Sequence, residues 1–284
     1  MSTLYDEITP FKHRGFFATI IGVLIGGGCL IALPTQAAEG QQFFGASPES
    51  FSTFYNFPGA PHIAISNHGN IVRYEGPTGY EHIGIGAFSE GYVLCYGSAA
   101  AYDLGDVETG FGAASASCSG PKCTITRNTT DGKMQLKQVI TKNAVLERSL
   151  NVEMTIKNLT GANLTNVILR RQVDFDVDTG GSLGSGDFTN WFSASEHYSV
   201  TAWNNANDHP NDDHAMVLRF FNRTPTTVKF DAKVTEDILD SSCNPVNIAK
   251  AAPVQGDYGA TMQYNVGTLG GAKSAVLTVQ YQRN

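Results

Sequence analysis

The stretch LNVEMTIKNLTGANLTNVILRRQVDFDVD, residues 150–178, decides the fold class, because apolar and polar residues alternate on both sides of a turn. Every second residue from Leu150 to Ile156 is apolar and the residues between are polar, which is typical of a half-buried strand. Residues 158–165 are rich in Asn and Gly and indicate a turn. The stretch therefore predicts two long strands joined as a hairpin.

The second strand of this hairpin carries a ladder of aspartates. Asp174, Asp176 and Asp178 alternate with apolar residues, whereas Arg171 interrupts the apolar face and predicts a sheet edge or a bulge. Carboxylates two residues apart on a strand lie about 7 Å apart and repel each other, so they must be solvated, paired with cationic side chains or bound to a cation. The period of two favours a solvated outer face for the aspartates. Asp178, beside a glycine-rich loop, is then the one aspartate of the ladder that we consider a candidate functional residue.

Comparable alternation recurs along the chain, with turn signals about every 10–15 residues. The composition, 42% hydrophobic and 16% charged, argues against disorder. We predict an all-β protein, a large antiparallel two-sheet β-sandwich that forms a single domain over residues 61–284. An initial strand and loop occupy residues 38–60. Only TEDILDSS, residues 235–242, predicts a helix, of two turns at most.

The N-terminus resembles a targeting segment. Basic residues 12–14 precede the apolar run 15–33, Pro34 follows, and small residues lead to Ala37. We predict a signal peptide over residues 1–37, cleaved after Ala37, and a secreted or otherwise extracytoplasmic location in the periplasm or at the cell surface. The alternatives are an uncleaved segment that anchors the chain in a membrane and a lipid-modified Cys29. The net charge of −7 argues against nucleic-acid binding.

Cysteine usage agrees with export. Apart from Cys29 the chain has four cysteines, and an even number in an exported chain predicts two disulfides. Three connectivities are possible. If Cys118 and Cys123 close a hairpin around Ser-Gly-Pro-Lys, Cys95 and Cys243 form a long-range bridge.

Three segments together resemble the large β-sandwiches of the galactose-mutarotase-like superfold. They are SNHGNIVRYEGPTGYEHIGIG (66–86), LRRQVDFDVD (169–178) and YNVGTLGGAKSAVLTVQYQ (264–282). Such supersandwich domains occur in carbohydrate-active enzymes, both as catalytic domains and as noncatalytic partners, so the resemblance implies a carbohydrate-related role. Asn67-His68 matches the dipeptide around one catalytic histidine of the mutarotases, but Gly69 and Asn70 stand where aromatic residues follow. The catalytic roles are therefore not carried over.

A cation site is one hypothesis for the acidic segment. The D-x-D-x-D pattern departs from a calcium loop, because Thr179 stands in place of glycine and Ser185 in place of glutamate. A non-standard Ca²⁺ site of Asp176, Asp178 and Asp187 remains open. The polar segment 204–216 could also ligate a metal, although a solvated loop explains it as well.

Two other residue classes are candidates. His68 and His82 are weak catalytic candidates, because a single histidine on a strand more often has a structural hydrogen bond. Trp191, Tyr198 and Trp203 would form a stacking platform for sugar rings if exposed, and part of the core if buried.

Motifs for nucleophilic or phosphate chemistry are missing: Gly-x-Ser-x-Gly, His-Glu-x-x-His and the phosphate-binding loop do not occur. The leading hypothesis is an exported noncatalytic module that binds a glycan or another cell-surface component. One alternative is a glycan-active enzyme that uses His68, His82 and the aspartates. Another is a cell-surface assembly subunit whose sheet edges pair with neighbours.

Overall fold

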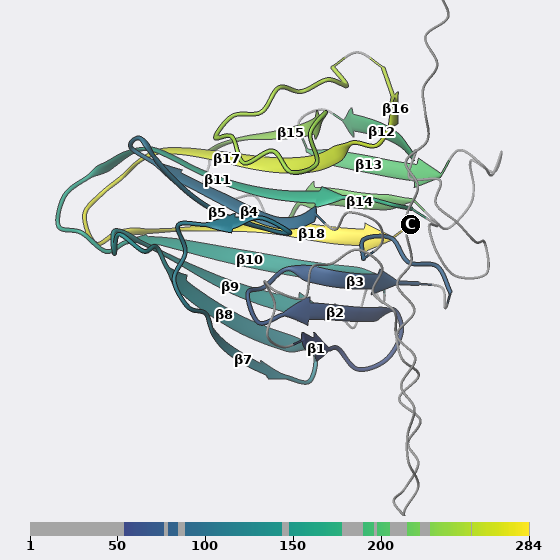
Figure 1. Ribbon diagram of the computed structural model, residues 1–284, viewed down its shortest axis with the longest axis horizontal. Coiled ribbons are helices and arrows are strands. Elements are labelled where there is room, and N and C mark those ends of the chain that lie inside the picture. The colour runs from purple at the N-terminus through teal and green to yellow at the C-terminus, as the bar shows by residue number, and fades with distance from the viewer. Residues whose placement is uncertain are drawn as a thin grey trace, which may run out of the picture. The chain divides into compact units, whose positions relative to one another are not determined.

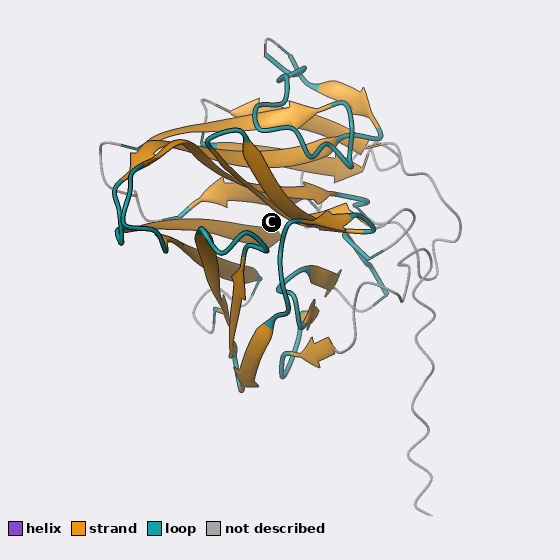
Figure 2. Ribbon diagram, turned by 60° about the vertical axis from the view of Figure 1, so that its left-hand side comes forward, coloured by secondary structure: helices purple, strands orange, loops and turns teal. Residues whose placement is uncertain are grey.

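The computed structural model describes residues 54–76, 79–84, 89–143, 148–177, 190–195, 198–204, 215–221, 228–250 and 252–283. Residues 42–284 form one compact unit. Its described part contains strands, turns and loops but no helix (Figure 2), which confirms the all-β prediction. The predicted signal peptide lies outside the described residues.

The strands form three antiparallel sheets. The largest has nine strands, in the order β16 (Val254–Gly256), β12 (Asn190–Ser195), β13 (Ser199–Asn204), β14 (Met216–Phe220), β18 (Ser274–Arg283), β10 (Ser149–Asn158), β9 (Met134–Lys142), β8 (Lys122–Asn128) and β7 (Ser115–Ser119). The second has six, in the order β15 (Lys229–Thr235), β17 (Gly259–Leu269), β11 (Leu164–Asp174), β4 (Ser89–Tyr96), β5 (Ala99–Gly105) and β6 (Glu108–Thr109). The third has three, β1 (Phe54–Asn56), β2 (His62–Ser66) and β3 (Ile71–Glu75).

The two larger sheets enclose the core as the layers of a sandwich (Figure 1). The apolar face predicted from Leu150 to Ile156 on β10 is fully buried. It belongs to the same cluster as Leu169 on β11 and Met262 on β17, in the six-stranded sheet. The three-stranded sheet adds its apolar residues to this cluster. The antiparallel sandwich prediction is thus confirmed, with a third small sheet beside the two large ones.

The strand that comes last in the described part of the chain, β18, lies in the interior of the largest sheet. β18 pairs with β10 on one side, from Ser149 opposite Gln282 to Lys157 opposite Ser274. On its other side it pairs with β14. It therefore joins β7–β10 to β12–β14 and β16 within one sheet.

The predicted hairpin between β10 and β11 is wrong. β10 pairs with β9 and β18 in one sheet, and β11 pairs with β4 and β17 in the other. The chain crosses between the layers over residues 159–163. The Asn158 amide is buried there and donates hydrogen bonds to the carbonyls of Ala162 (2.7 Å), Leu269 (3.0 Å) and Gly270 (3.1 Å). Both strands still turn an apolar face to the core, so alternation alone fits either arrangement.

The prediction of an edge or a bulge at Arg171 is also wrong. β11 lies in the interior of the six-stranded sheet, and Arg171 is fully buried on its core side. The buried carboxylate of Glu90 on β4 forms an ion pair with it, and Nη1 donates to Gln138 Oε1 at 2.6 Å. A buried charge is tolerated when it is paired and hydrogen-bonded, which is why the apolar pattern is interrupted here.

The predicted helix at 235–242 does not form. Asp237 and Asp240 instead accept hydrogen bonds from the backbone N–H groups of Leu239 (2.8 Å) and Ser242 (2.6 Å). Such side-chain bonds favour turns over helices. The cysteines pair as Cys95–Cys243 and Cys118–Cys123, and the second bridge closes the β7–β8 hairpin as expected.

Candidate functional site

Trp191 and Trp203 form a pair on the outward face of the nine-stranded sheet. They are register partners on β12 and β13, and their rings are stacked with centroids 6.4 Å apart and planes 12° apart. Both are partly exposed, whereas the alternate residues Phe192 and Ala202 are buried in the core. The alternation of the hairpin thus places two parallel indoles side by side at the surface.

Tyr198 does not join this pair. It is 48% exposed and lies at the turn of the β12–β13 hairpin, where its N–H donates to the Ser195 carbonyl at 2.8 Å. Its ring packs against Phe230, with centroids 5.6 Å apart. The structure therefore brings together two of the three predicted aromatic residues.

A row of polar side chains crosses the same sheet face beyond the tryptophans. Arg219 on β14 donates its Nε–H to Gln280 Oε1 on β18 at 2.7 Å, and Gln280 donates to Asn151 Oδ1 on β10 at 2.7 Å. The register places these residues on the same face as Trp203, because Ser199 of the same strand pairs with Arg219. This face therefore combines aromatic surface with amide and guanidinium groups.

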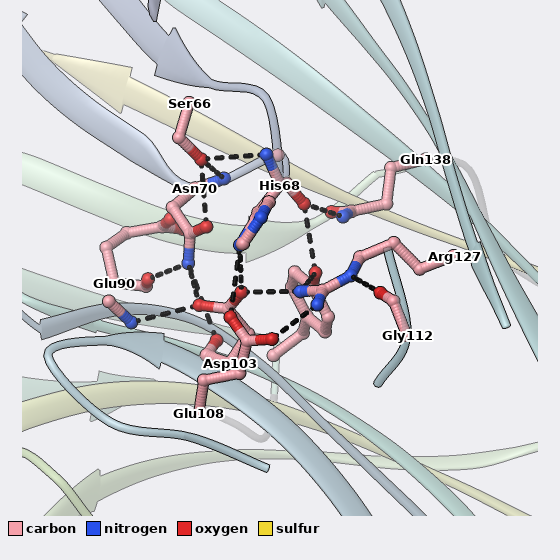
Figure 3. A network of polar contacts seen from close by, with 12 residues as sticks. Ser66, His68, Asn70, Glu90, Asp103, Glu108, Gly112, Arg127 and Gln138 are labelled. Carbon is pink, nitrogen blue, oxygen red and sulfur yellow. Dashed lines mark hydrogen bonds and ion pairs between the residues drawn. The ribbon is translucent and has the colours of Figure 1, made fainter. Parts of the chain in front are cut away.

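His68 belongs to a polar network between the sheets, centred on Asp103 (Figure 3). His68 Nδ1 lies 3.0 Å from Asp103 Oδ2 and 3.1 Å from Glu108 Oε2. The Arg127 guanidinium contacts the same two carboxylates, at 2.6 Å and 2.5 Å. Asn70 completes the group by donating to Asp103 Oδ1 at 3.0 Å. Two carboxylates and two cationic groups thus balance each other in a largely buried place.

The neighbouring charges shift the pKa values of this network. The hydrogen bonds that His68 donates to the Asp103 and Glu108 carboxylates raise its pKa to about 9. Burial raises the pKa of Glu108, but hydrogen bonds from His68 and Arg127 outweigh that effect and lower it to about 2. His68 is therefore protonated at neutral pH and cannot accept a proton there. Because His68 and Arg127 already neutralise both carboxylates, the set has no charge left for a metal ion to balance.

His82 has a structural place. It is fully buried, and its Nε2 donates to the Gly76 carbonyl at 2.9 Å, while its own carbonyl accepts the N–H of Asp176 at 3.1 Å. Neither predicted catalytic histidine is thus an exposed base.

The expectation of a solvated aspartate face is wrong. β11 ends at Asp174, so the alternation does not continue as a strand, and Asp174 and Asp176 are 4% and 1% exposed. Asp178 and Asp187 of the predicted cation site lie outside the described residues, as does most of the polar segment 204–216. The structure instead places Asp257 close to Asp174 and Asp176, so that these three aspartates form an acidic cluster.

Sequence reasoning missed Asp103, Glu108, Arg127 and Asp257. One signal was available for Arg127, which follows Cys123 and Ile125 at a period of two and so falls on an inward face. An arginine in that position implies a buried acidic partner. The identity of the partners follows from pairing across distant strands, which alternation does not specify.

No family model and no curated protein matches the chain. Solved structures similar to it include a bacterial glucoamylase in complex with acarbose (12% identity, TM-score 0.46, 78% of this chain and 30% of that one). Others are a candidate aldose 1-epimerase from Klebsiella pneumoniae (13%, 0.40, 78% and 76%) and a 4-alpha-glucanotransferase from Thermococcus litoralis (8%, 0.39, 78% and 36%). The chain thus spans less than a third of the length of the glucoamylase. The likeness to the epimerase is the resemblance predicted from the sequence, and it concerns the fold alone.

In the described part of the chain, no helix is long and apolar enough to cross a membrane.

Proposed function

We propose that the protein is an exported, noncatalytic module that binds carbohydrate through Trp191 and Trp203. The observation that carries the proposal is the parallel, partly exposed indole pair on β12 and β13. Sugar rings present apolar C–H faces that pack against aromatic planes, and a few polar groups then orient them. Arg219 and Asn151 are partly exposed on the same sheet face and are suited to that second task.

Two further observations support a noncatalytic, extracytoplasmic protein. The predicted catalytic histidines are engaged, His68 with two carboxylates and His82 with a carbonyl. The two disulfides agree with an oxidising compartment. The predicted signal peptide accounts for how the chain would reach it.

Glycan binding can be tested on the exported protein with a glycan array, followed by titration of tryptophan fluorescence with the best ligand. Trp191→Ala and Trp203→Ala should each weaken binding about 5–30-fold, because a lost stacking ring is worth about 1–2 kcal/mol. Tyr198→Ala is the matched control, since this exposed ring lies at the other end of the same hairpin. A blank array, or equal affinity in all three variants, would exclude this function.

A second candidate is assembly through the edge strand β7. Its residues Ser115–Ser119 carry no charge and four of the five are exposed. Among the described strands, β7 pairs with β8 alone. An uncharged edge is suited to pairing with another strand. Light scattering should then show an oligomer that Ser117→Lys converts to a monomer, whereas a monomeric wild-type protein would rule assembly out.

A further inference from the structure

A second cluster of acidic groups lies where β11 ends. Asp174 is the last residue of β11 and pairs with Gly259, the first residue of β17. Asp257 precedes Gly259 by two residues in the short link from β16, and Asp176 is held by its N–H bond to the His82 carbonyl. One carboxylate oxygen from each aspartate lies within 4.8 Å of the other two. Two distant chain segments therefore converge on one point with acceptor oxygens only.

Two of the three aspartates have a carboxylate oxygen without a hydrogen-bond partner among the described residues. The Oδ1 atoms of Asp174 and Asp176 are buried and receive no hydrogen bond from the described residues. Unpaired buried acceptors are rare and call for a ligand or a proton. Asp257 is exposed, so the cluster is open to solvent on its side.

The charges around the cluster are negative. Burial, together with the charges of Asp176 and Asp257, raises the pKa of Asp174, and burial with the charges of Asp257 and Glu81 does the same for Asp176. No lysine or arginine of the described residues offsets these effects in either case. The segment 178–189 that follows also contains no lysine, arginine or histidine. Neither the described residues around the cluster nor the sequence of 178–189 therefore provides a positive charge that would balance it.

We propose that Asp174, Asp176 and Asp257 bind a calcium ion. Carboxylate oxygens are the ligands that hard cations prefer, and calcium accepts irregular sets of six to eight oxygens at about 2.3–2.6 Å. Oxygens within 4.8 Å of one another can touch one calcium ion. Magnesium demands near-octahedral geometry at about 2.1 Å, which suits an irregular set of carboxylates less. Water and backbone carbonyls would supply the remaining ligands.

Calcium at this place would tie the end of β11 to the β16–β17 link. The site differs from the set predicted from the sequence, since Asp174 and Asp257 take the places of Asp178 and Asp187. It does not depend on carbohydrate binding, so either proposal can fail while the other stands. The rival explanation is a pair of protonated carboxyl groups that share no metal.

Calcium binding is tested on the full exported protein after dialysis against EDTA, by calorimetric titration with CaCl₂ and by thermal unfolding. With a dissociation constant of about 1 mM, typical of extracellular sites, ~10 mM CaCl₂ should raise the melting temperature by roughly 3–6 °C. The same concentration of MgCl₂ should raise it less. No heat of binding and equal melting temperatures in EDTA and CaCl₂ would overturn the proposal in favour of protonated carboxyl groups.

Variants locate the site. Asp257→Asn changes an exposed residue, so the fold should persist while calcium affinity falls at least about tenfold. Asp176→Asn should leave the melting temperature in EDTA unchanged or raise it, because the substitution removes a buried charge that is repelled by its neighbours. Calcium should then give no further rise in melting temperature. Glu153→Gln, which removes an exposed charge from β10, is the matched control and should keep the full calcium response. If both aspartate variants respond to calcium like the control, the ion binds elsewhere and the proposal is wrong.

Discussion

At the scale of single residues, two neighbouring buried arginines differ in whether their guanidinium groups are paired. Arg170 and Arg171 are consecutive on β11 and therefore point to opposite faces of the six-stranded sheet, and both are buried. Arg171 has an ion pair with Glu90 and several hydrogen bonds. Among the described residues, Arg170 has no hydrogen-bond partner for its three side-chain nitrogens, and the carboxylate that forms an ion pair with it, on Asp240, is 3.8 Å away.

This contrast predicts opposite results for the same substitution. Arg171→Met should lower the free energy of unfolding by about 3–5 kcal/mol, because it leaves the Glu90 carboxylate buried without a partner. Arg170→Met should leave it unchanged or raise it, since burial already disfavours the charged form and lowers the Arg170 pKa to about 10. Urea unfolding of both variants measures the difference. A destabilisation of similar size in both would show that Arg170 has partners after all.

The His68 network predicts a dependence of stability on pH. The pKa of His68 is about 9 in the folded protein, above the ordinary value of 6.5, so the folded state binds the proton more tightly than the unfolded state. The stabilisation is therefore complete below pH ~6.5 and is lost as the pH rises through about 9. NMR titration of the imidazole gives the folded pKa, and His68→Gln should remove this part of the pH dependence. An imidazole that titrates near its ordinary value would refute the network.

The aspartate ladder shows which features of single residues could be predicted from the sequence and which could not. Alternation correctly predicted that Val173, Phe175 and Val177 are buried. It placed Asp174 and Asp176 in solvent, because it assumes one covered face and one open face. The six-stranded sheet has buried residues on both faces near its centre, as Arg170 and Gln172 also show.

At the scale of elements, strands were predictable and their partners were not. The period of two placed β10 at nearly its observed bounds, because it depends on local burial alone, but it extended the next strand to Asp178, past the end of β11 at Asp174. Pairing depends on which strands meet across long sequence separations, as for β10 and β18. The same holds for the candidate sites. The two tryptophans belong to one hairpin and were predicted from the sequence. The acidic cluster is built from two distant segments, and the sequence predicted only the aspartates of the first segment.

The crossover between β10 and β11 depends on Asn158. Asn158→Ala would leave the carbonyls of Ala162, Leu269 and Gly270 without its donors, and we expect a loss of about 2–3 kcal/mol of stability. Asn163→Ala, at an exposed position of the same turn, should change stability by less than about 0.5 kcal/mol. Denaturant unfolding of the two variants makes the comparison, and equal effects would contradict a structural role for the buried amide.

At the scale of the whole molecule, the two disulfides differ in the length of chain they close. Cys95–Cys243 spans 148 residues and joins the six-stranded sheet to the segment after β15, whereas Cys118–Cys123 spans five within one hairpin. Loop-closure entropy predicts that removal of the long bridge by paired Cys→Ala substitutions costs about 5 kcal/mol, and removal of the short one about 2 kcal/mol. Thermal unfolding of the two double variants gives the order, and a reversed order would contradict the entropic account.

The central place of β18 has a consequence for how the protein is made. During synthesis, β7–β10 and β12–β14 leave the ribosome long before Ser274–Arg283, the strand that must fit between them. Until β18 emerges, β10 and β14 each expose an open edge that can pair with the wrong strand. The nine-stranded sheet therefore cannot close until β18 has been synthesised. Premature termination within β18 would leave two incomplete half-sheets.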